Sequence, residues 1–204
     1  MCITCRSCSR TANTGYRLWL AVDNHQPFLD KLDEAAAQQG LANQIRTQQA
    51  DMNALPFSPA SFDLIWSEGA LYQMGFENGL KTCLPLLASG GYLAVSEAVW
   101  LRPDPPDECR KMWDEEYPAI SDIEANLATI ESCGYENVGN FTLPESAWLE
   151  GYYAPLEKRL IPCVEKYKDD PDAQIVFDSI RTEIEAYRKF SKYYGYQFFV
   201  ARKK

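Results

Sequence analysis

Blocks of apolar and polar positions predict strands and helices that take turns along the chain. A compact apolar and aromatic run at residues 16–22 predicts a buried strand. The next apolar residues have helical spacing in a segment that begins near Pro27 and ends at Gly40. Its apolar stripe consists of Phe28, Leu29, Leu32, Ala35 and Ala36. The first third of the chain therefore predicts a strand followed by an amphipathic helix.

The same alternation continues to the carboxyl end. Further strands are predicted at residues 45–49, 62–66, 92–96, 138–143 and 196–201. Further helices are predicted at residues 78–88, 145–167 and 171–192. A short polar helix is predicted to end near Pro118. Another helix is predicted to begin with a capping box formed by Ser121 and Glu124 and to end at Gly134. Strands separated by such helices imply right-handed crossovers. We therefore expect an α/β fold with an open, mainly parallel sheet and helices on both faces.

The length of 204 residues favours one domain with a single core. We expect an irregular N-terminal tail at residues 1–15 and one α/β domain at residues 16–204, with a helical insertion at about 145–192 before the last strand. Aromatic residues are frequent in that insertion. They are interpreted either as the core of a helical subdomain or as a cap over an acceptor pocket.

Composition narrows the function classes. With 20 Lys and Arg against 29 Asp and Glu, the net charge is −9, and no basic stripe precedes the short basic C-terminal tail, so nucleic acid is not an expected partner. No apolar run approaches the ~20 residues that a membrane helix needs, and residues 18–22 are too short for a signal-peptide core. The seven cysteines do not form a disulfide framework. We expect reduced thiols and a cytoplasmic location.

Ligands of open α/β sheets bind beyond the carboxyl ends of the strands. The polar residues predicted at those ends are Asp23, Asp51, Ser67, Glu68, Ser96 and Glu97. An acid such as Asp23 can accept both hydroxyls of a ribose, but it can also cap a helix or form a turn. Asp51 can likewise accept an adenine amine, with Met52 against the ring, or form a simple Asx turn. Each alternative stays open on the residues alone.

The order and spacing of these motifs carry a resemblance. The segments are Asp23-Asn24, Asp51-Met52-Asn53-Ala54-Leu55-Pro56-Phe57, Ser61-Phe62-Asp63-Leu64-Ile65-Trp66-Ser67-Glu68-Gly69-Ala70, Leu84-Pro85-Leu86-Leu87 and Gly90-Gly91-Tyr92-Leu93. Together they resemble the class I S-adenosylmethionine-dependent methyltransferases, in the branch that acts on small molecules. The similarity runs from about residue 16 to residue 100.

The resemblance implies a Rossmann-like fold, S-adenosyl-L-methionine as cofactor and methyl transfer to an unidentified small molecule. It places Asp23, with Asn24 beside it, at the ribose hydroxyls, and Asp51 and Met52 at the adenine. It places Ser67, Glu68 and Gly69 beside the methionine part of the cofactor. The catalytic residue is not identified, because Glu68, Tyr72 and Glu97 could each serve as a general base.

One departure from the family pattern concerns the glycine-rich loop that follows the family's first strand. The corresponding window, residues 1–9, contains no glycine, and the first glycine is Gly15. We expect the first strand to be missing and cofactor binding to be weak. Either the chain is a truncated or frame-altered product, which we favour, or it is a divergent member with a damaged site. The alternative function is therefore that of a non-catalytic binding or scaffold protein. A homodimer in which a second chain fills the gap in the sheet is a further expectation from the missing strand.

The remaining motifs give weaker indications of function. Cys2, Cys5 and Cys8 have the spacing of an iron–sulfur or zinc ligand set, but Ala12 and Asn13 stand where a ferredoxin motif has its fourth cysteine and proline, so we expect no metal. His25 is the single histidine, which argues against a two-histidine metal site. We interpret it as a residue at the start of a helix or in the cofactor pocket. No tyrosine has a lysine four residues later, which argues against a short dehydrogenase.

Overall fold

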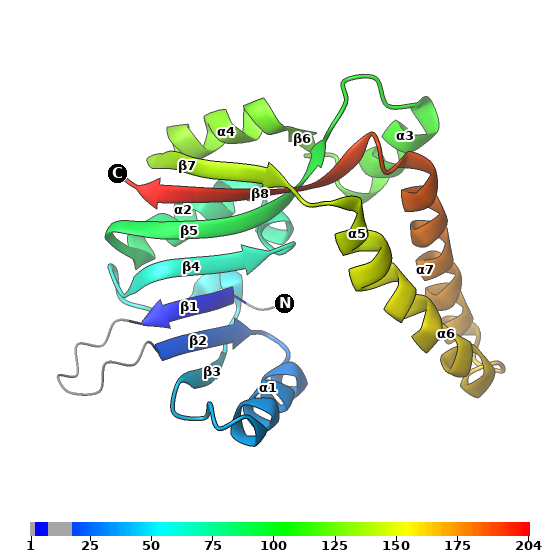
Figure 1. Ribbon diagram of the computed structural model, residues 1–204, viewed down its shortest axis with the longest axis horizontal. Coiled ribbons are helices and arrows are strands. Elements are labelled where there is room, and N and C mark those ends of the chain that lie inside the picture. Colours follow the sequence, from blue (N-terminus) through cyan, green and yellow to red (C-terminus); the bar gives the residue numbers. More distant parts are fainter. Residues whose placement is uncertain (1–2, 8–17) are drawn as a thin grey trace. The chain divides into compact units, whose positions relative to one another are not determined.

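The structure is a computed structural model that describes residues 3–7 as backbone and residues 18–204 in full (Figure 1). The chain divides into two compact units, whereas the sequence favours one domain. The first unit contains residues 1–98, 123–141 and 196–204, and the second contains residues 99–122 and 142–195. Each unit is described by itself.

A β-sheet forms the frame of the first unit (Figure 1). The strands are β1 (Ile3–Ser7), β2 (Leu18–Asp23), β3 (Ile45–Gln49), β4 (Phe62–Glu68), β5 (Leu87–Trp100), β6 (Ser121–Asp122), β7 (Tyr135–Thr142) and β8 (Tyr194–Lys203). Their order is β3-β2-β1-β4-β5-β8-β7, and β6 pairs with the end of β5. Strand β2 is parallel to β3, and β4 is parallel to β5. The sheet is open, as the alternating pattern predicts, and it combines these parallel pairs with the antiparallel pairs of β1.

Strand β1 lies in the middle of this sheet and runs antiparallel to both neighbours, β2 and β4. From the sequence, an irregular tail at residues 1–15 and a gap in the sheet are expected here. The structure instead has a strand at residues 3–7 that fills the gap, and the rest of the expected tail lies outside the described residues. Without β1, the facing edges of β2 and β4 would leave their N–H and C=O groups unpaired. The chain fills the central position itself, which removes the reason for expecting a second chain there.

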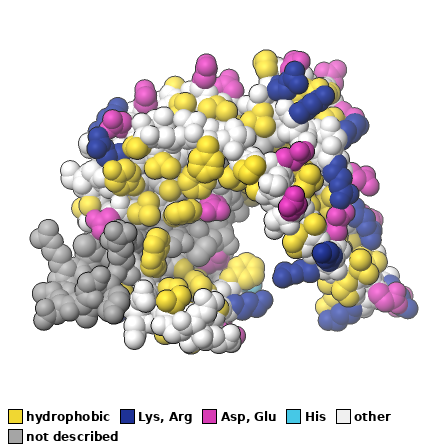
Figure 2. All heavy atoms as spheres, viewed as in Figure 1, with side chains coloured by type: hydrophobic (Ala, Val, Ile, Leu, Met, Phe, Trp, Pro, Cys, Tyr) yellow, Lys and Arg dark blue, Asp and Glu magenta, His cyan; other side chains and the backbone are white. Residues whose placement is uncertain are grey.

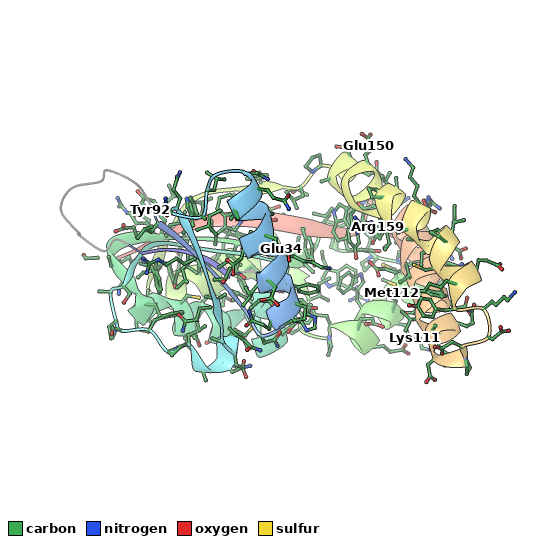
Figure 3. All side chains as sticks on the ribbon, turned by 90° about the horizontal axis from the view of Figure 1, so that it is seen from below. Glu34, Tyr92, Lys111, Met112, Glu150 and Arg159 are labelled. Atoms are coloured by element: carbon green, nitrogen blue, oxygen red, sulfur yellow. The ribbon has the colours of Figure 1, made fainter. Side chains whose placement is uncertain are left out.

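Three helices belong to the first unit: α1 (Gln26–Gln38), α2 (Phe76–Leu86) and α4 (Ile123–Ser132). Helix α1, on whose exposed side Figure 3 labels Glu34, contacts β2 and β3 and buries Leu29 and Ala36. Helix α2 lies behind β4 and β5 in Figure 1. Gly79 of α2 allows close contact with Leu71, since a Cβ at this position would come within 2.9 Å of the leucine side chain.

The two faces of the sheet differ in burial. The side chains of Ile65, Leu93 and Phe199 are almost completely buried on one face. On other positions of the same strands, Trp66 and Tyr92 keep 37% and 40% of their surface exposed. Figure 2 shows hydrophobic side chains gathered over these strands on the side that faces the viewer. An apolar surface of the first unit is therefore open to solvent.

The second unit is helical and contains the expected insertion. Its elements are α3 (Asp107–Glu116), α5 (Glu145–Trp148), a π-helical turn at Leu149–Tyr153, α6 (Ala154–Lys166) and α7 (Pro171–Phe190). Helices α6 and α7 run side by side, with Arg159 labelled on α6 in Figure 3.

Aromatic rings form the core of this second unit. The ring of Trp148 stacks on that of Tyr187 with centroids 4.7 Å apart, and Tyr153 lies 5.2 Å from the same tyrosine ring. The hydroxyl of Tyr153 donates a hydrogen bond to Glu183. Tyr153 is 2% exposed, whereas Tyr152 is 51% exposed. These contacts account for Trp148, Tyr153 and Tyr187 as packing residues, and the cap over an acceptor stays a prediction.

Two further observations concern the expected capping box and membrane-spanning helices. Ser121 does not start a helix but pairs with Val99 as part of β6, because the open side of β5 offers a parallel partner there. None of the helices in the described part of the chain is both long and apolar enough to span a membrane. Four cysteines of that part are free thiols: Cys83, Cys109, Cys133 and Cys163.

Candidate functional site

A pocket of about 360 Å³ opens at the carboxyl ends of β2 and β3 in the first unit. Asp23 is the last residue of β2 and pairs in register with Gln49 of β3. Asp51 follows two residues later, so the parallel pairing brings the two acids to the same edge of the sheet. The lining residues are Val22, Asp23, Asn24, His25, Phe28, Ala50, Asp51, Met52, Asn53 and Gln73. Four residues expected to contact the cofactor, Asp23, Asn24, Asp51 and Met52, therefore share one pocket.

Asp23 is held firmly in this pocket and is 5% exposed. Its carboxylate accepts a hydrogen bond of 2.8 Å from the backbone N–H of His25. Its carbonyl accepts one of 3.0 Å from the backbone N–H of Ala50. These two bonds tie the end of β2 to the start of α1 and to the chain that leaves β3. The carboxylate is thus preorganised at the mouth of the strand.

Asp51 is exposed and caps a short 3-10 turn at Met52–Ala54. Its Oδ1 accepts hydrogen bonds from the backbone N–H and the side-chain Nδ2 of Asn53, at 2.8 and 2.9 Å. The hydrogen bond from the backbone, and then that from the side chain, lower the pKa of Asp51 and keep it ionised at neutral pH. The Asx turn and the place in the pocket are therefore compatible.

Several residues of this pocket are not predicted from the sequence. Phe28 was expected in the buried stripe of α1, but 54% of its surface is exposed, and its ring lies edge-on to His25 at 4.6 Å. Position 28 is in the first turn of α1, where the apolar side of the helix no longer faces the sheet. Asn53 and Gln73 come from 3-10 turns, and no spacing rule marks them. His25 precedes α1 and also lines this pocket, so it is a residue at the start of a helix, and its place in the cofactor pocket stays a prediction.

The structure places the other predicted cofactor residues at the end of β4, outside the lining of this pocket. Ile3 of β1 pairs with both Val22 and Ser67, so the ends of β2 and β4 lie at one edge with β1 between them, roughly 10 Å apart. Ser67 is fully buried, and its Oγ has no hydrogen-bond partner among the described residues. The exposed Glu68 accepts a hydrogen bond from the indole of Trp66.

Gly69 follows β4 with a φ of +52°, a conformation that favours glycine. Its backbone N–H donates a hydrogen bond of 2.9 Å to the hydroxyl of Ser96, within β5. A Cβ on Gly69 would lie 3.1 Å from the hydroxyl oxygen of Tyr196. This turn is closely packed, and the backbone N–H of Gly69 is already used.

The candidate bases differ in access. Glu97 is 2% exposed near the end of β5, whereas Tyr72 is 38% exposed in the 3-10 turn Leu71–Met74. The side chains of the three N-terminal cysteines lie outside the described residues. In the described part of the chain, no group of three or more His, Cys, Asp or Glu side chains is placed to hold a metal ion.

Comparisons with known proteins agree with this geometry. A family model described as "Methyltransferase domain" matches residues 1–91. The uncharacterized methyltransferase YodH of Bacillus subtilis is 25% identical over 202 residues, which cover 98% of this chain and 82% of YodH.

Solved structures share the fold. An S-adenosylmethionine-dependent methyltransferase from Geobacter sulfurreducens, in complex with S-adenosylhomocysteine, has a TM-score of 0.78 and 19% identity, over 91% of this chain and 75% of that one. The [4+2]-cyclase SpnF has a TM-score of 0.69 and 20% identity, over 90% of this chain and 65% of the cyclase. In its fold the chain is similar to S-adenosylmethionine-dependent methyltransferases, and its first 91 residues match the methyltransferase-domain family.

Proposed function

We propose that the chain transfers a methyl group from S-adenosylmethionine to a small molecule and holds the adenosine half of the cofactor in the pocket at Asp23 and Asp51. The observation that carries this proposal is the meeting of Asp23, Asp51 and Met52 in one pocket. A fixed, buried carboxylate can accept hydrogen bonds from both ribose hydroxyls. Met52 supplies an apolar contact beside the second acid, which suits an adenine ring.

The transfer step needs chiefly alignment of the acceptor with the sulfonium methyl group, because the sulfonium is a good leaving group. Methyl transfer therefore requires a general base only for acceptors that must lose a proton. Glu68 is exposed at the end of β4, and Tyr72 is exposed in the turn after it. Both residues are on the edge of the sheet where the methyl group would lie. Glu97 is the buried alternative.

We further propose that cofactor binding by this chain is weak. Residues 1–9 contain no glycine, and β1 runs antiparallel to its neighbours. In the family, backbone N–H groups of a glycine-rich loop meet the methionine end of the cofactor at the carboxyl edge. Because β1 is reversed, its own carboxyl end points to the other edge of the sheet.

The same observation supports a second candidate function. A chain that keeps the fold but binds the cofactor weakly can act as a non-catalytic binding or scaffold protein. The fold neighbour SpnF is described as a [4+2]-cyclase, so not every protein with this fold is named a methyltransferase. For the setting of either function we propose the cytoplasm, supported by the four free thiols.

The test is a transfer assay with tritium-labelled S-adenosylmethionine and pooled small-molecule acceptors that present amine, thiol, phenol and carboxylate groups. We expect slow transfer of label to one pool, with release of S-adenosylhomocysteine, and loss of that transfer in Asp23→Ala. Asp63→Ala, at the amino end of β4 and away from the pocket, is the matched control. Binding of S-adenosylhomocysteine by calorimetry without transfer to any pool would favour the non-catalytic alternative.

A further inference from the structure

The turn after β4 lies between two of the candidate bases. Glu68 is the last residue of β4, and Tyr72 belongs to the 3-10 turn Leu71–Met74 that follows. The buried side chain of Leu71 anchors that 3-10 turn. Gly69 lies between the two anchored parts and has a φ of +52°. Rotation about the backbone of this glycine would therefore change where Glu68 and Tyr72 lie relative to each other.

Ser96 of β5 holds this glycine in place. Strands β4 and β5 run side by side in parallel, and their register ends with the pair Glu68 and Ser96 (Figure 1). One residue further on, the backbone N–H of Gly69 donates a hydrogen bond of 2.9 Å to the hydroxyl of Ser96. The hydroxyl thus replaces the backbone acceptor that the ladder no longer supplies. Ser96 is itself buried, as are its neighbours Val95 and Glu97, so the hydroxyl is firmly placed.

A second contact restrains the same glycine from β8. A Cβ at Gly69 would come within 3.1 Å of the hydroxyl oxygen of Tyr196. Tyr196 therefore packs directly against the glycine, and a larger residue at position 69 would have to displace that ring. Residues 69, 96 and 196 all belong to the first unit. Three strands thus define the position of one turn at the carboxyl end of β4.

We propose that Ser96 is a positioning residue for methyl transfer: through its bond to Gly69 it fixes how the candidate bases on both sides of the turn face the acceptor. This inference rests on the proposed function, because it concerns the same reaction. Methyl transfer depends chiefly on alignment, and a small displacement of an aligned group slows the chemical step. Strand β1 separates β4 from β2 and its Asp23. Loss of the Ser96 hydroxyl should therefore slow transfer and leave binding of the adenosine half unchanged.

Amide hydrogen exchange of Gly69, followed by NMR on the full chain, tests the first step. In Ser96→Ala the N–H loses its acceptor, so its exchange should be at least about tenfold faster than in the natural chain. Ser96→Thr keeps a hydroxyl at this position and should stay within about threefold of the natural rate. Ser89→Ala, at the exposed amino end of β5, is the matched control and should change nothing. Unchanged exchange in Ser96→Ala would overturn the inference, whatever the activity of the chain.

Initial rates with labelled S-adenosylmethionine and the acceptor pool that the natural chain uses test the second step. We expect kcat of Ser96→Ala to fall about tenfold and its KM for S-adenosylmethionine to stay within about twofold, while Ser96→Thr and Ser89→Ala match the natural chain. An unchanged kcat, or a KM that rises as much as kcat falls, would overturn the inference while the proposed function stands. If the natural chain transfers label to no pool, the proposed function fails, and the positioning role fails with it.

Discussion

The carboxylate of Asp23 accepts a hydrogen bond of 2.8 Å from the backbone N–H of His25, two residues later. This bond holds the last residue of β2 against the first turn of α1. It also gives Asp23 the geometry of an Asx turn before α1, which is the purely structural interpretation of an acid after a strand. The pocket shows that the same carboxylate can serve both purposes, since Asp23 and His25 both line it.

Replacement of Asp23 is the most direct test of the site. Asp23→Ala should weaken binding of S-adenosylhomocysteine by about 1.5 to 3 kcal/mol, roughly ten- to 150-fold, because charge-assisted hydrogen bonds to the ribose are lost. Asp23→Asn keeps an acceptor for the N–H of His25 and separates binding from folding. Asp30→Ala, on the exposed side of α1, is the control for calorimetry. Unchanged affinity in a folded Asp23→Ala protein would remove this residue from the site.

A chimera tests the role of the glycine-rich loop. Residues 1–17 are replaced by a parallel strand, glycine-rich loop and helix of the family's form. Two or three restored hydrogen bonds to the methionine end should tighten binding of S-adenosylhomocysteine about a hundredfold. The same chimera with valine in place of the loop glycines is the control. Equal, low-micromolar calorimetric affinities for the chimera and the natural chain would show that the loop is dispensable.

The thiol of Cys83 predicts a pH dependence of stability. Burial raises its pKa from 9.0 to about 12, so the folded chain keeps a proton that the unfolded chain releases above pH 9. The stability that this proton contributes is complete below pH 9 and is lost as the pH rises toward 12, by about 1.4 kcal/mol per pH unit.

Urea unfolding at pH 8.5 and pH 10.5 measures this effect. The natural chain should lose more stability between these two values than Cys83→Ala, which lacks the buried thiol. Cys163→Ala, at a partly exposed position of α6, is the matched control and should keep the slope of the natural chain. Parallel curves for the natural chain and Cys83→Ala would contradict the predicted pKa.

The N-terminal cysteines predict an analytical result. Three closely spaced thiols without a fourth ligand make an incomplete site. Elemental analysis of purified chain should therefore find less than about 0.1 zinc or iron per molecule. A stoichiometric metal would show that a distant side chain completes the set, and a Cys5→Ser variant would then have to lose it.

The alternation of apolar blocks allowed most of the described elements to be predicted. The predicted helix that begins near Pro27 and ends at Gly40 is α1, and the predicted strand at residues 45–49 is β3, because caps, glycines and short-range periodicity act within a few residues. The predictions were wrong at Ser121, which joins β6, and at Phe28, which lies outside the core. Both residues depend on a partner strand or a sheet edge that local patterns do not contain.

By itself, the sequence determined the order of the elements except β1 and β6, the acidic charge and the family resemblance, since each depends on residue identity and spacing. The tertiary structure decided that β1 enters the centre of the sheet in the reverse direction and that Asp23, Asp51 and Phe28 line one pocket. A short segment such as Ile3–Ser7 carries no local signal for its direction, because strands of both senses show the same alternation of side chains. Only the unpaired edges of β2 and β4, which are brought together by the rest of the fold, give that segment a place.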